Sequence, residues 1–426
     1  MSSLETPYPG RPLVDPPATA RPSARSGEAL RRPAVGHPTP GTEAPGPVTG
    51  SLPDWPAVDP FAFADDLGPV RIIHVWEPSL ELRGILVVDN VAAGPAIGGL
   101  RMAPDVSLEE CFRLARAMTL KNAAAGLPHG GGKSVLFGDP RMATERKERM
   151  VRTMAAALAG DSGYIFGPDM GTDEQCMAWV RDEIGRATGL PREVGGIPLD
   201  EIGATGWGLR HAVEVAAQFC DLELDGARLA IQGFGAVGKH AARFLTERGA
   251  VLVAASDSRG AIHDPAGLDV AALIEIKDRG GSVIDYADGE KLDRDALVTV
   301  DCDVWIPAAR PDAIHEGNVA SLRARLVVPG ANIATTPAAE QSMHEHDILC
   351  VPDFIANAGG VICASVEYHG GSETAAMASI EEKIHDNTRA VLERVRSARM
   401  LPRAAAVELA TERVRRAMRL RRHHVF

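Results

Sequence analysis

The sequence predicts an α/β fold with more than one domain, and three observations support this. Its 426 residues are enough for two or three domains of roughly 100–200 residues each. Hydrophobic residues make up 45% of the chain, so most of it is expected to enclose a core. From about residue 70 onward, short apolar runs alternate with stretches of helical periodicity, which is typical of a parallel sheet covered by helices.

Composition argues against several classes of protein. The net charge of −12 argues against nucleic-acid binding through overall basic charge. No apolar run approaches the roughly 18 residues of a membrane helix, and the N-terminus lacks the apolar segment of a secretory signal. The six cysteines include no CxxC pair, so neither a disulfide framework nor a zinc ribbon is expected, and no metal site is predicted. We therefore expect a cytoplasmic protein with reduced thiols that binds neither nucleic acid nor membrane.

Residues 1–55 are expected to form a disordered tail. The first 50 residues contain eleven prolines, no Ile, Phe, Trp or Cys, and a single aromatic residue, Tyr8. Such a segment buries too little apolar surface to offset its loss of conformational entropy. An organellar transit peptide is the weaker alternative, because such peptides are poor in acidic residues. This segment contains four of them: Glu5, Asp15, Glu28 and Glu43.

The first half of the remaining chain predicts two strands and then two helices. Residues 71–76 and 82–89 have the composition of strands. Residues 107–124 have helical periodicity and open with Ser-x-x-Glu, the pattern of a capping box. A second helix is expected over 145–159.

The second half predicts strands that alternate with helices. A helix over 203–219 is entered through glycines, and a strand over 228–232 is followed at once by a glycine turn and a helix over 237–247. The next strand is expected over 251–256. Three further short apolar strands have the spacing of a parallel sheet: 303–307, 326–328 and 349–352. Two helices are expected at the end of the chain: 380–397 and 404–422.

A glycine motif between a predicted strand and a predicted helix indicates a dinucleotide site. Gly233, Gly235 and Gly238 form GxGxxG, and Asp257 follows the next strand, 19 residues after Gly238. The first glycine allows the tight turn, the second lets the backbone approach a pyrophosphate, and the third lets helix pack on strand. The alternative is a purely structural glycine turn. An acid at 257 suits a ribose 2′-hydroxyl and favours NAD, whereas Arg259 is suited to the 2′-phosphate of NADP, so NADP remains open.

Two lysines indicate an anion-binding and acid–base site. Only seven of the 45 basic residues are lysine, yet Lys121 and Lys133 lie 12 positions apart, the second directly after three glycines. Two nearby ammonium groups lower each other's pKa, so one is expected to bind a carboxylate and the other to act as an acid or base. The alternative is two surface lysines flanking a loop. Asp169 is a candidate for proton transfer, with a helix N-cap as the alternative.

Several long strings occur in the order seen in one enzyme superfamily: MTLKNAAAGLPHGGGKSV, GPDMGT, ATGWG, GFGAVG, PGANIATTPAA and DFIANAGGV. The chain resembles the glutamate/leucine/phenylalanine/valine dehydrogenase superfamily over roughly residues 70–426. The resemblance implies reversible oxidative deamination of an L-amino acid to its 2-oxo acid and ammonia with NAD or NADP. It also implies an N-terminal α/β substrate domain, a Rossmann dinucleotide-binding domain, an active-site cleft between them, and a homo-oligomer, with a hexamer favoured.

The resemblance also implies roles for single residues. Lys121 resembles the lysine that binds the substrate α-carboxylate, Lys133 the catalytic lysine, and Asp169 the acid that shuttles the proton. Asn357 resembles the amide that orients substrate beside the nicotinamide. The residues that resemble cofactor contacts are Thr205, Gly233, Gly235, Ala236, Val237, Gly238, Asp257, Ala308 in the turn 307–309, and Asn332.

The substrate side-chain pocket departs from the glutamate enzymes. Beside Gly98, Ile97 stands where they place a lysine for the substrate side-chain carboxylate. Met118 stands where bacterial glutamate enzymes can carry Gln, and Ala364 where they place Ser. Burying an unpaired carboxylate costs several kcal/mol, whereas burying a Val- or Leu-sized side chain gains about 1.5–3 kcal/mol. The pocket therefore predicts an apolar substrate and is closest to the leucine/phenylalanine branch, although a shifted backbone or a distant Arg would still allow a carboxylate.

We therefore expect an NAD(P)-dependent dehydrogenase of an apolar L-amino acid. The alternatives are a glutamate dehydrogenase with a rearranged side-chain pocket and a catalytically silent regulatory subunit of such an enzyme. The expected organisation has four parts: the tail 1–55, a substrate-binding domain 56–200, a Rossmann domain 201–364, and C-terminal helices 365–426 that pack back toward the substrate domain.

Overall fold

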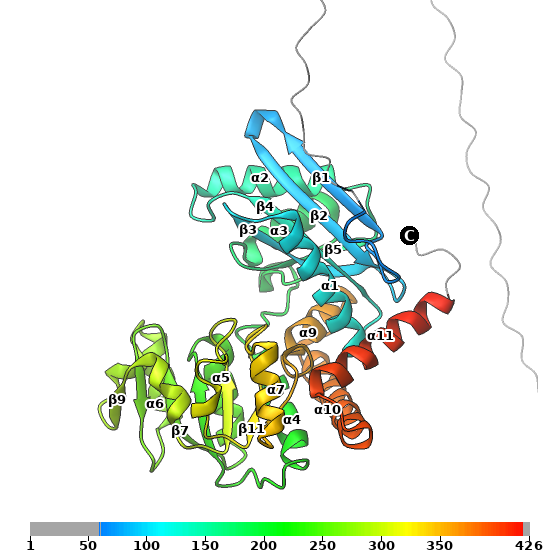
Figure 1. Cartoon of the computed structure of the whole chain (residues 1–426). Coiled ribbons are helices and arrows are strands. Elements are labelled where there is room, and N and C mark those ends of the chain that lie inside the picture. Colours follow the sequence, from blue (N-terminus) through cyan, green and yellow to red (C-terminus); the bar gives the residue numbers. More distant parts are fainter. Residues whose placement is uncertain (1–58, 60, 421–426) are drawn as a thin grey trace, which may run out of the picture. The chain divides into compact units, whose positions relative to one another are not determined.

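The computed structural model in Figure 1 describes residues 59 and 61–420. The predicted disordered tail, 1–55, lies outside these residues. The described part contains two sheets and no helix long and apolar enough to cross a membrane.

The first sheet of the described part has five strands in the order β1-β2-β4-β3-β5. Their bounds are β1 Arg71–Glu77, β2 Leu82–Asn90, β3 Ala96–Ala103, β4 Gly130–Phe137 and β5 Tyr164–Pro168. Three helices belong with this sheet: α1 Leu108–Ala124, α2 Thr144–Ala157 and α3 Glu174–Ile184. β2 pairs antiparallel with β1 and β4, whereas β3 pairs parallel with β4 and β5. The three strands β4, β3 and β5 therefore bring their C-terminal halves to one edge of the sheet.

Side chains of β2 alternate between two cores, as the period of a strand requires. Ile85 and Val87 face α1 together with buried Cys111 and Ala115 of that helix. Leu86 and Val88 lie on the opposite face, in the core that includes residues of α2 and α3. Both faces of the sheet are thus covered, which explains why every residue of β2 except Arg83 is buried.

The three glycines before Lys133 lie in strand β4. A Cβ added at Gly130 would stand 1.7 Å from the carbonyl oxygen of Asn90, and one at Gly131 would stand 2.0 Å from the amide nitrogen of Thr119. The glycines are needed because β4 runs unusually close to its own neighbours. This close approach fixes the position of Lys133 beside α1.

The second sheet of the described part has seven strands in the order β12-β11-β10-β6-β7-β8-β9. Their bounds are β6 Arg228–Gln232, β7 Val251–Ser256, β8 Ala261–His263, β9 Glu290–Leu292, β10 Val304–Pro307, β11 Leu326–Val327 and β12 Leu349–Cys350. The pairs from β12 to β7 are parallel, and β8 and β9 extend the sheet antiparallel. Four helices belong with it: α4 Ala204–Ala217, α5 Ala236–Thr246, α6 Val270–Asp278 and α7 Pro337–Glu345. The predicted Rossmann arrangement is confirmed by this order and by the strand–turn–helix β6–α5.

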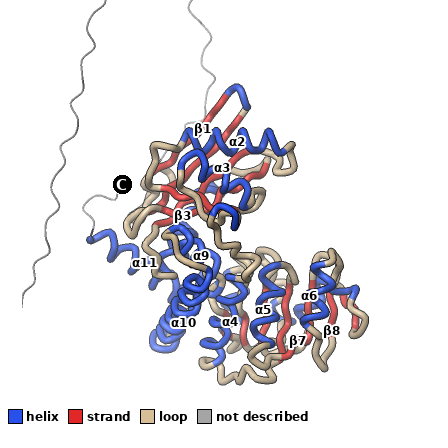
Figure 2. The backbone as a smooth tube through the Cα atoms, turned by 180° about the vertical axis from the view of Figure 1, so that it is seen from behind, coloured by secondary structure: helices blue, strands red, loops and turns tan. Residues whose placement is uncertain are grey.

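The described part of the chain ends in four helices, whose bounds are α8 Asp353–Ala356, α9 Gly359–Tyr368, α10 Glu373–Ala398 and α11 Pro402–Leu420. Helices α9 and α10 lie beside α4, and α11 runs back to α1 (Figures 1 and 2). Arg413 of α11 donates to the carbonyl oxygens of Ala123 and Ala124 at the C-terminal end of α1, at 3.2 and 2.5 Å. A cation at this position satisfies carbonyls that a helix leaves unpaired.

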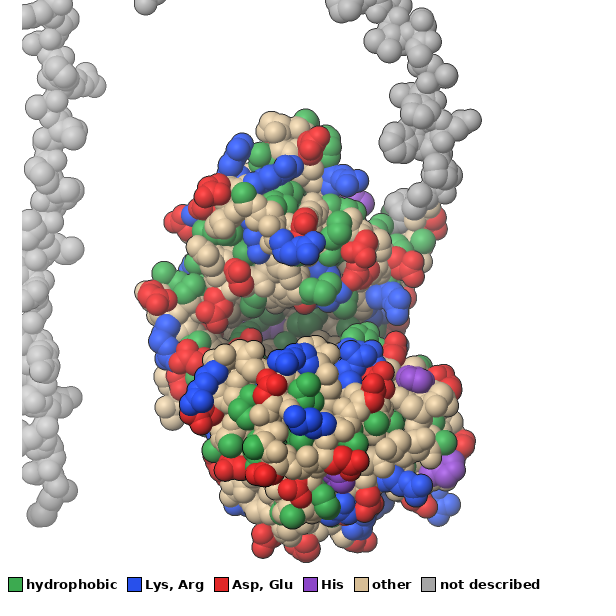
Figure 3. All heavy atoms as spheres, turned by 90° about the vertical axis from the view of Figure 1, so that its left-hand side faces the viewer, with side chains coloured by type: hydrophobic (Ala, Val, Ile, Leu, Met, Phe, Trp, Pro, Cys, Tyr) green, Lys and Arg blue, Asp and Glu red, His purple; other side chains and the backbone are tan. Residues whose placement is uncertain are grey.

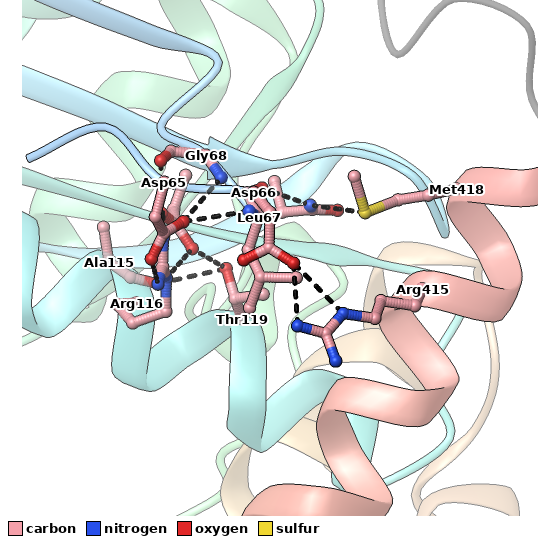
Figure 4. Close-up of polar contacts among 11 residues, drawn as sticks. Asp65, Asp66, Leu67, Gly68, Ala115, Arg116, Thr119, Arg415 and Met418 are labelled. Atoms are coloured by element: carbon pink, nitrogen blue, oxygen red, sulfur yellow. Dashed lines mark hydrogen bonds and ion pairs between the residues drawn. The ribbon is translucent and has the colours of Figure 1, made fainter. Parts of the chain in front are cut away.

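A second contact joins α1 and α11 to the segment before β1 (Figure 4). Arg116 of α1 donates to Asp65 at 2.6 and 2.8 Å and to buried Asp89 at 2.9 Å, and Arg415 of α11 pairs with Asp66 at 2.7 Å. The Arg116 hydrogen bonds lower the pKa of Asp65 to about 2 against the opposing effect of burial. The chain's last described helix is thereby fastened to its first described residues.

Candidate active site

A cavity of about 440 Å³ lies between the two sheets and α9. In the space-filling view the molecule is hollowed at its middle, with apolar side chains inside the hollow (Figure 3). Its wall includes eleven of the residues that the sequence predicted: Ile97, Gly98, Met118, Lys121, Lys133, Asp169, Thr205, Val237, Asn332, Asn357 and Ala364. The other predicted residues, which include most of the glycine motif, do not line it.

Lys133 and Asp169 form an ion pair on this wall. Lys133 projects from β4, and Asp169 follows the end of β5, with β3 between them in the sheet. Arg101 of β3 lies on the other side of the carboxylate, with its Nε 3.3 Å from Asp169 Oδ2. Burial alone would raise the pKa of Asp169, but the Lys133 ammonium and then Arg101 hold it below its ordinary value. A proton shared between an amine and a carboxylate in contact is suited to acid–base chemistry.

Asp169 does not cap a helix. The N-cap of α3 is Asp173, whose carboxylate accepts from the amide of Cys176 at 2.9 Å. The side chain of Asp169 is directed to Lys133 and Arg101 instead. The N-cap alternative is therefore wrong for Asp169, and the proton-transfer interpretation stays a prediction.

Lys121 lies in the last turn of α1 and reaches toward the second sheet. Its Nζ is 3.5 Å from Asn332 Oδ1, which also accepts from Asn357 Nδ2 at 2.9 Å. Burial lowers the pKa of the Lys121 ammonium to about 8, while the more distant Asp353 opposes the change and Lys133 adds to it. Repulsion between the two lysines, the cause expected from the sequence, is thus a smaller contribution than desolvation.

The end of the cavity beside Ile97 is apolar. Ile97 is 3% exposed, Ala364 of α9 is 8% exposed, and Met118 of α1 and Val361 also line the cavity. Thr188 lines it beside Ala364, and its hydroxyl donates to the Ala364 carbonyl oxygen at 2.9 Å. Of the described residues on the cavity wall, the cationic ones are Lys121 and Lys133, which lie at the Asn332 and Asp169 contacts described above. A group placed beside Ile97, Met118, Val361 and Ala364 therefore meets aliphatic side chains.

The glycine motif fits a dinucleotide. Gly233 has φ +94°, and a Cβ there would stand 2.8 Å from Ala309, while a Cβ on Gly238 would stand 2.0 Å from the carbonyl oxygen of Gly233. Gly235, the N-cap of α5, has open space where its Cβ would be. Ala236 and Val237 form the first turn of α5, so free amides and the positive end of the helix dipole face that open space. NAD(P) would be held here by this loop, with Thr205 and Asn332 nearer the substrate cavity.

Asp257 has a role that the sequence did not predict. Its carboxylate, 8% exposed, accepts from Lys277 Nζ at 2.7 Å, from Ser282 Oγ at 2.8 Å and from the amide of Val283 at 3.0 Å. Although burial opposes it, these donors lower the pKa of Asp257 to about 2. Both carboxylate oxygens of Asp257 already accept hydrogen bonds within the protein, so a ribose hydroxyl would have to donate to an oxygen that is already bonded. The preference for NAD over NADP therefore stays a prediction.

Sequence reasoning missed two polar residues beside the cavity. Arg101 ends the string GPAIGGLR, and membership of that string was the only sequence feature that could have marked it as a site residue. Glu367 of α9 is 8% exposed and accepts from the backbone amides of Gly189 and Ile197, each at 2.8 Å. No local pattern marks Glu367, because its partners lie 170 or more positions away.

The fold and the cavity define a two-sheet dehydrogenase with a Rossmann cofactor domain. The family Glutamate/Leucine/Phenylalanine/Valine dehydrogenase matches residues 195–422, and its dimerisation domain matches residues 77–186. The chain belongs to this family and is an NAD(P)-dependent amino-acid dehydrogenase.

Three similar proteins illustrate the relationship. The NADP(+)-dependent glutamate dehydrogenase of Pyrobaculum calidifontis is 39% identical over 70% of this chain and 77% of its own length. The NAD-specific glutamate dehydrogenase of Staphylococcus aureus is 36% identical over 78% of this chain and 84% of its own. The crystal structure of the hetero-hexameric glutamate dehydrogenase of Thermus thermophilus, in its Leu-bound form, has a TM-score of 0.74 at 31% identity, covering 83% of this chain and 90% of that one.

Proposed function

We propose that this enzyme deaminates an apolar L-amino acid in preference to glutamate. The single observation that carries the proposal is the aliphatic lining formed by Ile97, Met118 and Ala364 at the side-chain end of the cavity. A side-chain carboxylate placed there would lose its hydration without gaining a cation, at a cost of several kcal/mol. A Leu- or Val-sized group would gain about 1.5–3 kcal/mol by the same burial.

The cavity supports a division of roles among its polar residues. Lys121 binds the substrate α-carboxylate, and Asn357 orients the amino group beside the nicotinamide. NAD(P), held by the loop of Gly233, Gly235 and Gly238, would supply the acceptor for a hydride from the substrate Cα. Lys133 then positions and activates the water that adds to the resulting imine, and Asp169 transfers protons to and from the nitrogen. Because Lys133 and Asp169 are in contact, a proton passes between them without crossing solvent.

Glutamate, held by a rearranged side-chain pocket, is the second candidate substrate. The names of the relatives support it better than they support an apolar substrate, since the similar proteins described above are glutamate dehydrogenases. The residues that line the cavity favour the apolar substrate. The two candidates therefore differ in a measurable ratio of rates.

Initial rates with each of the twenty amino acids, with NAD and with NADP, distinguish the candidates. If the apolar proposal holds, kcat/KM for leucine, valine or another apolar amino acid exceeds that for glutamate. A penalty of about 3 kcal/mol corresponds to a ratio of about 100. A preference for glutamate would overturn the proposal and favour the second candidate. If the protein binds the cofactor but none of the twenty amino acids yields NADH or NADPH, the protein would be a regulatory subunit.

A pocket variant tests the residues directly. Ile97→Lys with Ala364→Ser is expected to raise kcat/KM for glutamate relative to leucine. The matched control is Ile97→Met, which keeps the volume and polarity of the site and is expected to leave the ratio nearly unchanged. An unchanged ratio in the lysine variant would remove Ile97 from the side-chain pocket.

We further propose that the protein assembles as a hexamer. The region that matches the dimerisation domain and the hexameric state of the Thermus thermophilus protein support this. Trp76, 59% exposed on edge strand β1, is an apolar group that a subunit contact would cover. Light scattering coupled to gel filtration is expected to give six times the chain mass of 45.1 kDa.

A further inference from the structure

A second cluster of polar side chains lies away from the active-site cavity, between α4 and α10. His211 and Glu214 stand three positions apart on α4, and His385 approaches them from α10. One potential ligand atom from each residue lies within 4.8 Å of the others. None of the three lines the substrate cavity, and the predicted chemistry uses none of them.

The spacing of these atoms matches a small coordination sphere. Glu214 Oε2 lies 3.0 Å from His211 Nδ1 and 3.7 Å from His385 Nε2. An ion bound at about 2.0–2.1 Å in tetrahedral geometry holds its ligands about 3.3 Å apart. The two separations from Glu214 bracket that value, and the ligand atoms of the two histidines lie within 4.8 Å of each other, so side-chain rotation would bring the three groups around one ion.

His211 carries the strongest evidence. Its side chain is 2% exposed, and neither ring nitrogen makes a hydrogen bond to any described residue. The contact of Nδ1 with Glu214 has the distance but not the direction of a hydrogen bond. Buried polar atoms are nearly always satisfied. An unpaired imidazole nitrogen 3.0 Å from a carboxylate oxygen, with a second imidazole ring 5.2 Å away between centroids, is therefore available as a metal ligand.

Glu214 is oriented to offer one oxygen. Arg210 Nε and Arg248 Nε donate to its Oε1 at 3.1 and 2.8 Å. Oε2, which is left to the histidines, therefore points to the centre of the cluster. Such outer partners commonly fix the ligands of metal sites. Glu381, one turn before His385 on α10, brings Oε2 to 3.9 Å from His211 Nε2 and offers the same support to the histidine.

We propose that His211, Glu214 and His385 bind one divalent transition-metal ion of the zinc class. Two imidazoles and a carboxylate are ligands that suit zinc, with water in the fourth position. His385 is 39% exposed and borders a surface cavity of about 620 Å³, which gives the ion a path to the site. The ion would clamp a helix of the Rossmann domain to the long C-terminal helix, because its ligands come from both.

The experiment titrates Zn²⁺ into chelator-treated, full-length protein in competition with a chromophoric chelator. The expected result is one tight site per chain in the wild type. His385→Asn and, separately, Glu214→Gln are expected to weaken binding by more than the roughly 10–100-fold that loss of an outer partner costs. The matched control is His74→Asn, which removes an exposed histidine of β1 and is expected to leave affinity unchanged.

A second measurement separates lost binding from lost folding. Zn²⁺ is expected to raise the midpoint temperature of thermal unfolding for the wild type and for His74→Asn, but not for His385→Asn. Without metal, His385→Asn should unfold at the same temperature as the wild type, because His385 is partly exposed. Equal Zn²⁺ affinity in wild type and His385→Asn would overturn the proposal, as would absence of a stoichiometric site. In either case the three residues form only a charge cluster, with His211 between Glu214 and Glu381.

Discussion

Replacing Lys121 by Met is expected to stabilise the fold while it weakens substrate binding. Lys121 is only partly exposed, and burial lowers the pKa of its ammonium from 10.5 to about 8. At neutral pH the charged form is therefore less favourable in the folded chain than in the unfolded chain. Met keeps the length and the apolar stem of the side chain without the charge.

The magnitude follows from the change in proton affinity. A fall in pKa from 10.5 to about 8 corresponds to about 3.4 kcal/mol at about 1.36 kcal/mol per tenfold change. Partial exposure screens the charge, so we expect a gain of about 1–3 kcal/mol at pH 7. The destabilisation is complete below pH 8, where both states are charged. It decreases as pH rises from 8 to 10.5 and disappears above 10.5, where both are neutral.

Chemical unfolding at pH 7 and at pH 10.5 measures this difference. Lys121→Met should unfold at higher denaturant concentration than wild type at pH 7, and the two midpoints should converge at pH 10.5. Lys291→Met, at an exposed lysine, is the matched control and should leave the midpoint unchanged at both values. A Lys121→Met variant less stable than wild type at pH 7, or an equal advantage at both pH values, would refute the reasoning.

Two further predictions concern the cavity wall, and a third concerns the contact of α1 and α11 with the segment before β1. Lys133→Ala should reduce kcat by about 10²–10⁴-fold while the protein stays folded and binds NAD, and a rate within a few-fold of wild type would remove it from the mechanism. Asp169→Asn should lose activity to a similar degree, since Asp173 already caps the helix; retained turnover would leave Asp169 only a structural role. Arg116→Met should destabilise the fold by about 3–5 kcal/mol in urea unfolding, because Asp89, fully buried, loses its cation. Arg415→Met, which breaks an exposed pair, should change stability by at most about 1 kcal/mol, and equal effects of the two variants would contradict this argument.

The second sheet could be predicted more fully than the first. Strands β6 and β7 have the bounds that the sequence predicted, because each is a continuous apolar run that ends at a glycine or polar turn. Strands β3 and β4 were missed because each contains glycines, which have low strand propensity. These glycines are required by close contact with residues distant in sequence, which local pattern does not reveal. Helix α10 begins at Glu373, earlier than the predicted 380, because Ser372 caps it by accepting from Ala375.

In the site, too, residues marked by local sequence pattern could be predicted and contacts with distant residues could not. Lys121, Lys133 and Asp169 were identified because residue type and spacing carried a signal, and the structure places all three on one cavity wall. The bonds that Asp257 makes to Lys277 and Ser282 were not predictable, since they depend on helix α6 and the turn after it, 20 or more positions away. Local pattern thus indicates which groups are present, whereas tertiary contacts decide which of their atoms remain available.

Glu367 links the two places where the chain crosses between the sheets. The outgoing crossing contains Gly189 and Ile197, and the returning one is helix α9, so a single buried carboxylate ties both together. Sliding the two halves past each other would break several charge-assisted hydrogen bonds, whereas rotation about this point would preserve them. Thr188 and Ala364 stand beside this point and also line the cavity, joined by a hydrogen bond of 2.9 Å. A rotation of one half against the other about Glu367 would therefore displace the cavity wall beside Thr188 and Ala364 less than the wall farther from Glu367.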